Sequence, residues 1–223
     1  MLVTDLLYQW PSAAYFGRRV PKEKFYERAN VNTALREKFV AEIDHVIWAY
    51  DLAQTSINLE GTDEVPDIAV FQVKAKGMDV SEPVLSAVDR SMPRPLIFEI
   101  NRDVAGKREA RMVAAHKQIG AGVPKISQYF STGWQDADAE RQPLPTAITL
   151  PALYAALLEP LTKIETRPGE SMSEVAERVK TVSKLEREIK ALERKLHNEK
   201  QFNRKVELRR TLKTKQAQLE QQR

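Results

Sequence analysis

The sequence predicts an α+β domain followed by an antiparallel helical hairpin, and three observations support this. In residues 1–165, segments of alternating apolar and polar residues are separated by segments with helical spacing, as in a mixed or mostly antiparallel sheet with flanking helices. The segment "TRPGES", residues 166–171, contains the proline and glycine that end a helix, so residues 166–170 form a linker. Residues 171–223 contain neither glycine nor proline, and their apolar residues recur every three or four positions, as in a coiled coil.

In the first domain, spacing predicts the helices and alternation predicts the strands. Leu35, Phe39 and Ile43 share one face of a helix, and the segment "HVIWAYDLA" that follows alternates like a strand. The segment "NRDVAGK", residues 101–107, is expected to connect two strands as a hairpin, and "GAG", residues 120–122, to lie in the next loop. We expect helices over residues 32–44, 82–92 and 151–161, and strands over residues 45–53, 56–59, 68–76, 95–100, 108–117 and 125–134.

The tail is expected to fold back on itself near residue 202. Its first half has an apolar seam formed by Val175, Val182, Leu185, Ile189, Leu192 and Leu196. A straight heptad would continue this seam onto mostly polar residues. An antiparallel hairpin instead brings the apolar residues of both halves together, in the pairs Leu196–Leu208, Leu192–Leu212, Ile189–Lys215 and Leu185–Leu219.

Two capping signals mark the starts of the predicted hairpin helices. Ser171 and Glu174 have the spacing of a capping box. Asn203 is suited to cap the returning helix. The alternative is one long helix that pairs with a second chain, which would make the protein a structural dimeriser.

Charge is unevenly distributed along the chain, whose net charge is +4. Residues 1–165 hold 19 Lys+Arg against 22 Asp+Glu, whereas residues 166–223 hold 16 against 9. A basic tail indicates an acidic partner, most commonly nucleic acid, although such charge also simply solvates an exposed helix. Six basic residues cluster around the predicted turn, namely Lys195, Lys200, Arg204, Lys205, Arg209 and Arg210.

Composition and motifs argue against several classes of protein. The chain has no cysteine, which excludes disulfides and thiolate metal sites and fits a cytoplasmic protein. Its longest apolar run, residues 150–161, is too short to span a bilayer, and the first residues do not resemble a secretory signal. His45, His116 and His197 lack metal-site spacing, and the glycines form no nucleotide-binding loop. We therefore expect no metal and no cofactor.

One predicted strand, "PDIAVFQVKAK", carries residue types found in nuclease sites. The expected order helix–strand–strand–strand–helix–strand is that of the restriction-endonuclease core, and Gln72 and Lys74 project from the same face of their strand. A Mg²⁺ nuclease of that fold adds an aspartate from an adjacent strand. Asp67 lies on the opposite face, but Asp51 or Glu60 could complete the site from neighbouring strands. Two alternatives stay open: a half-exposed strand with polar residues facing water, and a vestigial nuclease core.

The segment "FGRRVPKEKFYERA", residues 16–29, mixes cations with aromatic rings. Such a mixture is typical of a nucleic-acid surface, where cations meet phosphates and rings stack on bases. The candidate cations are Arg18, Arg19, Lys22 and Lys24. Alternatively, Phe25 and Tyr26 simply anchor a short helix.

Three stretches, "FGRRVPKEKFYERANVNTALREKFV", "VIWAYDLAQTSINL" and "EKQFNRKVEL", resemble the bacterial domain-of-unknown-function family DUF4391. The resemblance extends over nearly the whole chain, including "YFSTGW" and the predicted hairpin. Members of that family tend to be encoded beside Swi/Snf-type helicases and DNA methyltransferases, in loci that resemble restriction-modification and phage-defence islands. The resemblance implies this setting, and it assigns no reaction and no catalytic residue.

We therefore expect a non-catalytic accessory or adaptor subunit of a DNA-targeting anti-phage defence complex. In this interpretation the α+β domain docks on a helicase or methyltransferase, and the basic hairpin tip contacts DNA or an acidic face of a partner. Two alternatives remain at this point: a Mg²⁺-dependent nuclease subunit using Gln72 and Lys74, and a structural dimerisation protein.

Overall fold

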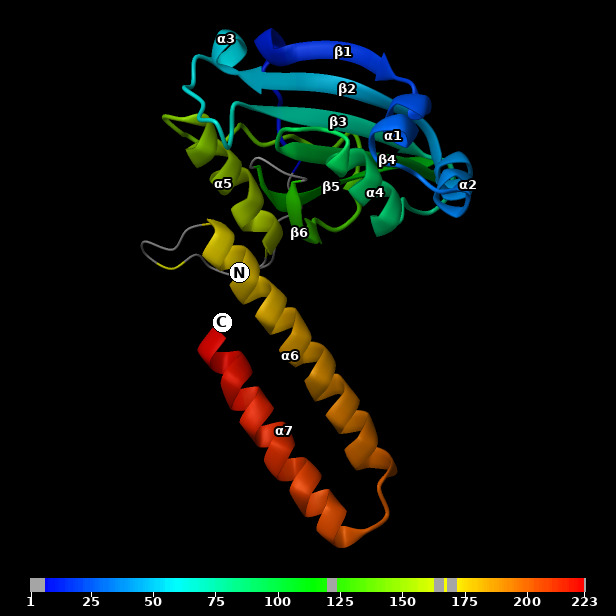
Figure 1. The fold of residues 1–223 in the computed structure, drawn as a ribbon, viewed down its shortest axis with the longest axis vertical. Coiled ribbons are helices and arrows are strands. Elements are labelled where there is room, and N and C mark those ends of the chain that lie inside the picture. Colours follow the sequence, from blue (N-terminus) through cyan, green and yellow to red (C-terminus); the bar gives the residue numbers. More distant parts are fainter. Residues whose placement is uncertain (1–6, 120–123, 163–166, 168–171, 223) are drawn as a thin grey trace. The chain divides into compact units, whose positions relative to one another are not determined.

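The chain divides into two compact units, Met1–Lys163 and Ile164–Arg223. The computed structural model describes residues 7–119, 124–162, 167 and 172–222. The predicted α+β class and the C-terminal helical hairpin are both confirmed (Figure 1). Three predicted features lie outside the described residues: the linker apart from Arg167, the "GAG" segment, and Ser171 of the capping box. No helix in the described part of the chain is long and apolar enough to cross a membrane.

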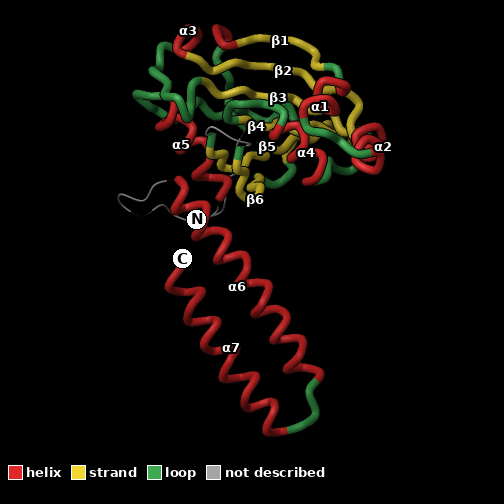
Figure 2. The backbone as a smooth tube through the Cα atoms, in the orientation of Figure 1, coloured by secondary structure: helices red, strands yellow, loops and turns green. Residues whose placement is uncertain are grey.

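The first unit is built on a mixed sheet whose strands lie side by side in chain order (Figures 1 and 2). β3 and β4 pair in parallel, and the other neighbouring strands pair antiparallel. A parallel pair needs a crossover connection, which contains helix α4. The strands are β1 (Tyr15–Val20), β2 (Ile43–Ala53), β3 (Asp67–Ala75), β4 (Leu96–Val104), β5 (Lys107–Gln118) and β6 (Lys125–Ser131), and the short β7 (Gln135–Asp136) pairs with β5.

One helix of this unit, α2, begins at a side-chain cap that the sequence supplies. The Asn32 side chain accepts a 2.9 Å hydrogen bond from the Leu35 amide, which satisfies a free donor in the first turn of α2. The helices are η1 (Ser12–Ala14), α1 (Lys22–Arg28), α2 (Thr33–Glu42), α3 (Gln54–Ile57), α4 (Glu82–Arg90) and α5 (Leu150–Thr162).

The alternation of β3 defines two faces of the sheet. Ala69, Phe71 and Val73 point to one face, where they pack in one hydrophobic cluster with Phe25 of α1 and Phe39 of α2. Residues of α4 complete this cluster. We call this the first face. Gln72 and Lys74 point to the opposite, second face, as predicted.

The predicted strand over residues 56–59 is wrong, because this segment forms the end of α3 and a turn. The Ser56 hydroxyl accepts a 2.9 Å hydrogen bond from the Ala53 amide and donates to the Asp51 carbonyl, which closes a helical turn. Asn58 then adopts a left-handed conformation with φ 57°. Two strands, not three, therefore lie between α2 and α4, so the predicted order of the restriction-endonuclease core is also wrong. β1, which the sequence analysis did not predict, pairs with β2.

The predicted hairpin connection over residues 101–107 is much longer than the one observed. β4 continues to Val104 and β5 begins at Lys107. The two residues between them, Ala105 and Gly106, have φ values of 49° and 79°. Two successive positive φ angles are typical of the tight two-residue turn whose twist matches that of paired strands.

The second unit is an antiparallel pair of helices, α6 (Met172–Asn198) and α7 (Phe202–Gln222). Val182, Leu185, Ile189 and Leu219 form its buried cluster, and Leu212 packs against them. This agrees with the predicted Leu185–Leu219 pairing. The Lys215 and Glu188 side chains form a 2.8 Å ion pair beside the cluster. The alternative of one long helix is wrong.

A three-residue turn, residues 199–201, joins the two helices. The Glu199 carboxylate accepts hydrogen bonds from the Lys200 and Gln201 amides at 2.8 and 2.9 Å. Helix α7 begins at Phe202. The predicted cap at Asn203 is therefore wrong, because that residue already lies within the first turn of the helix.

Candidate functional site

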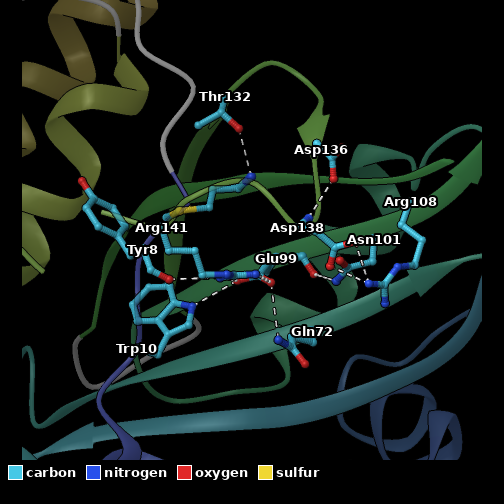
Figure 3. A network of polar contacts seen from close by, with 11 residues as sticks. Tyr8, Trp10, Gln72, Glu99, Asn101, Arg108, Thr132, Asp136, Asp138 and Arg141 are labelled. Carbon is cyan, nitrogen blue, oxygen red and sulfur yellow. Dashed lines mark hydrogen bonds and ion pairs between the residues drawn. The ribbon is translucent and has the colours of Figure 1, made fainter. Parts of the chain in front are cut away.

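A polar network on the second face centres on Glu99 of β4, whose side chain is almost fully buried (Figure 3). The Arg141 guanidinium binds both carboxylate oxygens of Glu99, with distances of 2.8 and 3.0 Å. The Trp10 indole donates a third hydrogen bond, of 3.1 Å. The arginine charge and these hydrogen bonds compensate the buried carboxylate for the water that it has lost.

The predicted pair Gln72 and Lys74 borders this network. The Gln72 amide donates to a Glu99 oxygen at 3.4 Å (Figure 3). The Lys74 ammonium lies 2.5 Å from a carboxylate oxygen of Asp103. Each residue therefore has a partner on β4. The Lys74 ammonium is paired with Asp103, so it is not free to orient a water molecule as the nuclease interpretation requires.

The same network fastens the N-terminal segment to the sheet. The Gln9 amide donates to the Gln142 carbonyl at 2.7 Å, and the Arg141 side chain donates to the Tyr8 carbonyl at 3.0 Å. Trp10 lies against Tyr50, with 6.0 Å between ring centres. Burial raises the pKa of the Tyr50 hydroxyl. These contacts hold the N-terminal segment against the sheet, so the network around Glu99 has a structural role.

Asp51 lies on the first face, so it cannot join Gln72 and Lys74 as the nuclease interpretation required. Ile47 pairs with Gln72, and simple alternation would place Asp51 on the same face. A register shift between Trp48 and Tyr50 adds one residue to β2 and reverses the alternation. Asp51 instead pairs with Ala69, which belongs to the first face.

On the first face, Asp51 and Asp67 share one cation, the Arg94 guanidinium. Arg94 lies 2.8 Å from an Asp67 oxygen and 3.7 Å from an Asp51 oxygen. It also lies over the Trp48 ring, 5.1 Å from its centre. Burial raises the pKa of both carboxyl groups, and the negative charge of Asp67 raises that of Asp51 further. Arg94 opposes both shifts.

Glu60, the other acid of the nuclease interpretation, lies far from Gln72 along the strand direction. It forms an isolated bridge with Thr149. The next residue, Gly61, lies against the backbone of Pro66, just before β3 begins. Gln72 follows Pro66 by six residues, which is about 20 Å of extended strand. The structure therefore does not bring the four candidate nuclease residues together.

The histidines are equally dispersed. His45 contacts the Asp44 carboxylate at 2.8 Å, and burial lowers the pKa of the His116 imidazole. His197 is exposed near the end of α6. Among the described residues, no group of three or more His, Cys, Asp or Glu side chains could hold a metal ion.

The basic residues of the N-terminal segment divide between several surfaces. Arg18 pairs with Trp48 on the first face, whereas Arg19 pairs with Ile47 on the second. Lys22 donates to the Ile43 carbonyl at 2.5 Å, and burial lowers its pKa. The predicted basic surface is therefore not continuous.

Helix α1 is held by its aromatic residues, as the structural alternative predicted. Phe25 is 2 % exposed and belongs to the core of the first face. The Tyr26 ring packs edge-on against Phe39, with 5.3 Å between ring centres. Lys24 is exposed and lines a cavity on this face.

The hairpin tip brings the predicted basic residues of the tail together. Five of the six are exposed and Lys205 is half-buried. In the described part of the chain, none of them has an ion-pair partner within 4 Å. Phe202 and Val206 are also exposed beside them. A cleft of about 580 Å³ lies between the helix ends, with Arg194, Lys195 and Arg204 in its lining.

Sequence reasoning missed the Glu99 network, although one signal was present. Glu99 is the single charged residue in the apolar strand segment "PLIFEI". A charge in a buried strand needs a partner, so this position calls for a cation from elsewhere in the chain. Its partner Arg141 lies 42 residues away in a segment without helical or strand periodicity, and nothing in the sequence identifies it.

Comparison with known proteins is consistent with this architecture. The family model "Domain of unknown function (DUF4391)" matches residues 9–219, which spans both units. No curated protein and no solved structure matches the chain significantly. The hairpin is thus part of the family's domain rather than an appendage to it. The chain belongs to the DUF4391 family.

Proposed function

We propose that this protein is a cytoplasmic, non-catalytic accessory subunit of a DNA-targeting anti-phage defence complex. Its first unit docks on a helicase or DNA methyltransferase, and its hairpin tip contacts the DNA backbone. The observation that carries the proposal is the tip, where a helical pair that closes its own apolar seam leaves six cations with no ion-pair partner within 4 Å among the described residues. The resemblance to DUF4391, whose members tend to be encoded beside such enzymes, supplies the setting.

The charge pattern supports a role in binding. Cations that stabilise a fold are placed against acids, as Arg141 is against Glu99. Five of the six cations of the tip are exposed instead. A cluster of unpaired Lys and Arg side chains on one compact element is the electrostatic footprint of a nucleic-acid contact.

The arrangement around Gln72 and Lys74 supports a subunit without nuclease chemistry of its own. Lys74 is paired with Asp103, and the nearest carboxylate to Gln72 is neutralised by Arg141. Asp51 lies on the other face of the sheet.

The proposal is tested by replacing Lys200, Arg204 and Lys205 together with glutamine. Phosphate contacts release counterions, so the slope of log affinity for duplex DNA against log salt should flatten by about 2 to 3 units. Base sequence should matter little, since phosphates carry no sequence information. The matched control replaces Lys184, Lys190 and Lys213, exposed lysines of the same hairpin away from the turn, and should leave the slope unchanged.

Three outcomes would contradict the proposal. Unchanged DNA binding together with loss of a co-encoded protein would make the tip a protein-binding surface. If neither DNA binding nor protein binding changes, the positive charge of the tip serves only to keep an exposed turn hydrated. Cleavage of DNA with Mg²⁺ or Mn²⁺ that disappears in Lys74→Ala would favour the nuclease alternative.

A further inference from the structure

A cavity of about 460 Å³ opens on the first face of the sheet, away from the Glu99 network. It lies between the edge of the sheet, helix α1 and the segment that follows α4. Its floor consists of large apolar side chains: Val20, Phe25, Trp48, Phe71 and Met92. Phe25 and Phe71 are also members of the hydrophobic core, so this floor is rigid.

The lining offers few groups to a polar ligand. Of the described residues that line it, only Ser91 carries a hydroxyl, and that hydroxyl already donates to the Val88 carbonyl at 2.6 Å. A polar group that enters such a site loses water without gaining a hydrogen bond, which is unfavourable. The interior therefore selects an apolar group.

The rim of the cavity is cationic. Lys24 and Arg28 are four residues apart on α1, so their side chains lie on the same side of the helix. Both residues are exposed, and neither side chain forms a hydrogen bond or ion pair with another described residue. Arg94 forms the opposite wall, where Asp67 and Trp48 fix its guanidinium. Among the described residues, no acidic side chain lines the cavity.

We infer that this cavity binds an apolar side chain of a partner protein that is flanked by acidic residues. The apolar anchor lies against the half-buried side chains of Val20 and Trp48, and the flanking carboxylates meet Lys24 and Arg28. This inference rests on the proposed role as an adaptor and assigns the docking surface of the first unit. Charge complementarity identifies the occupant: an apolar floor inside a ring of cations fits an acidic segment with a hydrophobic anchor.

A nucleotide base is the competing occupant, since cations and aromatic rings also bind single-stranded nucleic acid. Base edges carry several donors and acceptors, and this floor would leave them unpaired. One face of Trp48 is also engaged by Phe16, with ring centres 4.6 Å apart. The structure therefore favours a protein segment.

Full-length protein is titrated against two fluorescent synthetic peptides in an anisotropy assay. The first peptide carries Leu and Phe at its centre and Asp and Glu on both sides, and the second has both apolar residues replaced by alanine. We expect the first to bind at least about tenfold more tightly, because hydrophobic anchors contribute most of the affinity at such sites. Equal affinities would show that the apolar floor is not used.

The rim is tested with the double variant Lys24→Glu and Arg28→Glu. Both side chains are exposed, so the fold should be retained. Affinity for the first peptide should fall about tenfold or more at low salt. A control that reverses Lys38 and Lys107, exposed lysines of the same unit away from the cavity, should bind normally. Unchanged binding by the rim variant would overturn the inference.

Two further measurements separate this inference from the proposed function. The tip variant with Lys200, Arg204 and Lys205 replaced by glutamine should bind the peptide normally. If the rim variant still binds the peptide and the tip variant no longer binds DNA, the inference fails and the proposed function stands. If an oligothymidylate binds in a manner that depends on Lys24 and Arg28 and the peptide does not, the cavity is a nucleic-acid site.

Discussion

The two units of this protein use positive charge in opposite ways. In the α+β unit the cations of the core and of the Glu99 network face dedicated acids: the buried Lys117 meets Asp89, and the half-buried Arg141 meets Glu99. Lys117 also donates to the carbonyls of Asp89, Met92 and Arg94, which holds the segment after α4 in place. In the hairpin, five of the six cations around the turn are exposed, and the apolar cluster that contains Leu185 and Leu219 holds the two helices together.

This difference separates structural charge from charge available to a partner. A buried cation replaced by a neutral residue leaves its acid unpaired in a low-dielectric surrounding, so stability falls. An exposed cation without a partner contributes little to folding. Neutralising a cation should therefore lower stability strongly in the α+β unit and only slightly at the hairpin turn. Four predictions test this difference between the units.

The largest effect is expected for Lys117→Met. Both Lys117 and Asp89 are almost fully buried, and the Tyr129 hydroxyl also donates to Asp89 at 2.9 Å. Removing the ammonium leaves a buried carboxylate without its cation, and the Met92 and Arg94 carbonyls lose a donor. We expect a loss of about 3 to 5 kcal/mol in the free energy of unfolding, measured by urea denaturation. Lys125→Met, at an exposed site, serves as the control, and equal stability of both variants would contradict the comparison.

Leu185→Asp should disrupt the hairpin with a somewhat smaller effect. The substitution places a carboxylate among Val182, Ile189 and Leu219. The expected cost is about 2 to 4 kcal/mol for the second unit, seen as a loss of helical circular dichroism. Glu186→Asp, on the exposed side of α6, provides the control. A variant that keeps its full helical signal would show that the seam does not hold the hairpin together.

Arg94→Met should give a moderate effect that depends on pH. Asp51 and Asp67 already have pKa values raised above those of an unfolded chain, and loss of the guanidinium raises them further. We expect a loss of about 1 to 2 kcal/mol at pH 7. Because raised carboxyl pKa values favour the folded state only when the groups are protonated, the loss should shrink as the pH falls toward about 4.

Urea unfolding of Arg94→Met and of the native protein at several pH values measures this effect. Lys38→Met should show no such dependence. A destabilisation that grows in acid would reverse the expected sign, and would mean that Arg94 does not stabilise the two carboxylates.

The smallest effect is expected at the tip. Replacement of Lys200, Arg204 and Lys205 by glutamine should change the free energy of unfolding by less than about 0.5 kcal/mol. Thermal unfolding followed by circular dichroism measures it. A clear destabilisation would show that these cations are structural, which would remove the distinction between the units.

The sequence predicted the features that depend on local periodicity. The leucine spacing predicted the hairpin and its register, because one apolar stripe must meet another. The alternation of β3 placed Gln72 and Lys74 on one face and Phe71 on the other. Prediction failed where a side-chain hydrogen bond overrode the pattern. Ser56 closes a helical turn in a segment that alternates like a strand.

The candidate site was harder to predict because it depends on register and on distant pairings. The extra residue in β2 between Trp48 and Tyr50 moves Asp51 to the other face of the sheet. No residue type in that strand indicates a bulge. The Trp10–Glu99 contact joins residues 89 positions apart. Such pairings follow from how the whole sheet is assembled, which local patterns do not encode.

The length of the hairpin determines how far its turn lies from its base. Helix α6 has 27 residues, which rise about 40 Å from the base of the hairpin to its turn. On B-form DNA this length corresponds to about 12 base pairs. Helix α7 has 21 residues, so removing one heptad from each helix would shorten the hairpin by about 10 Å while keeping all six cations around the turn.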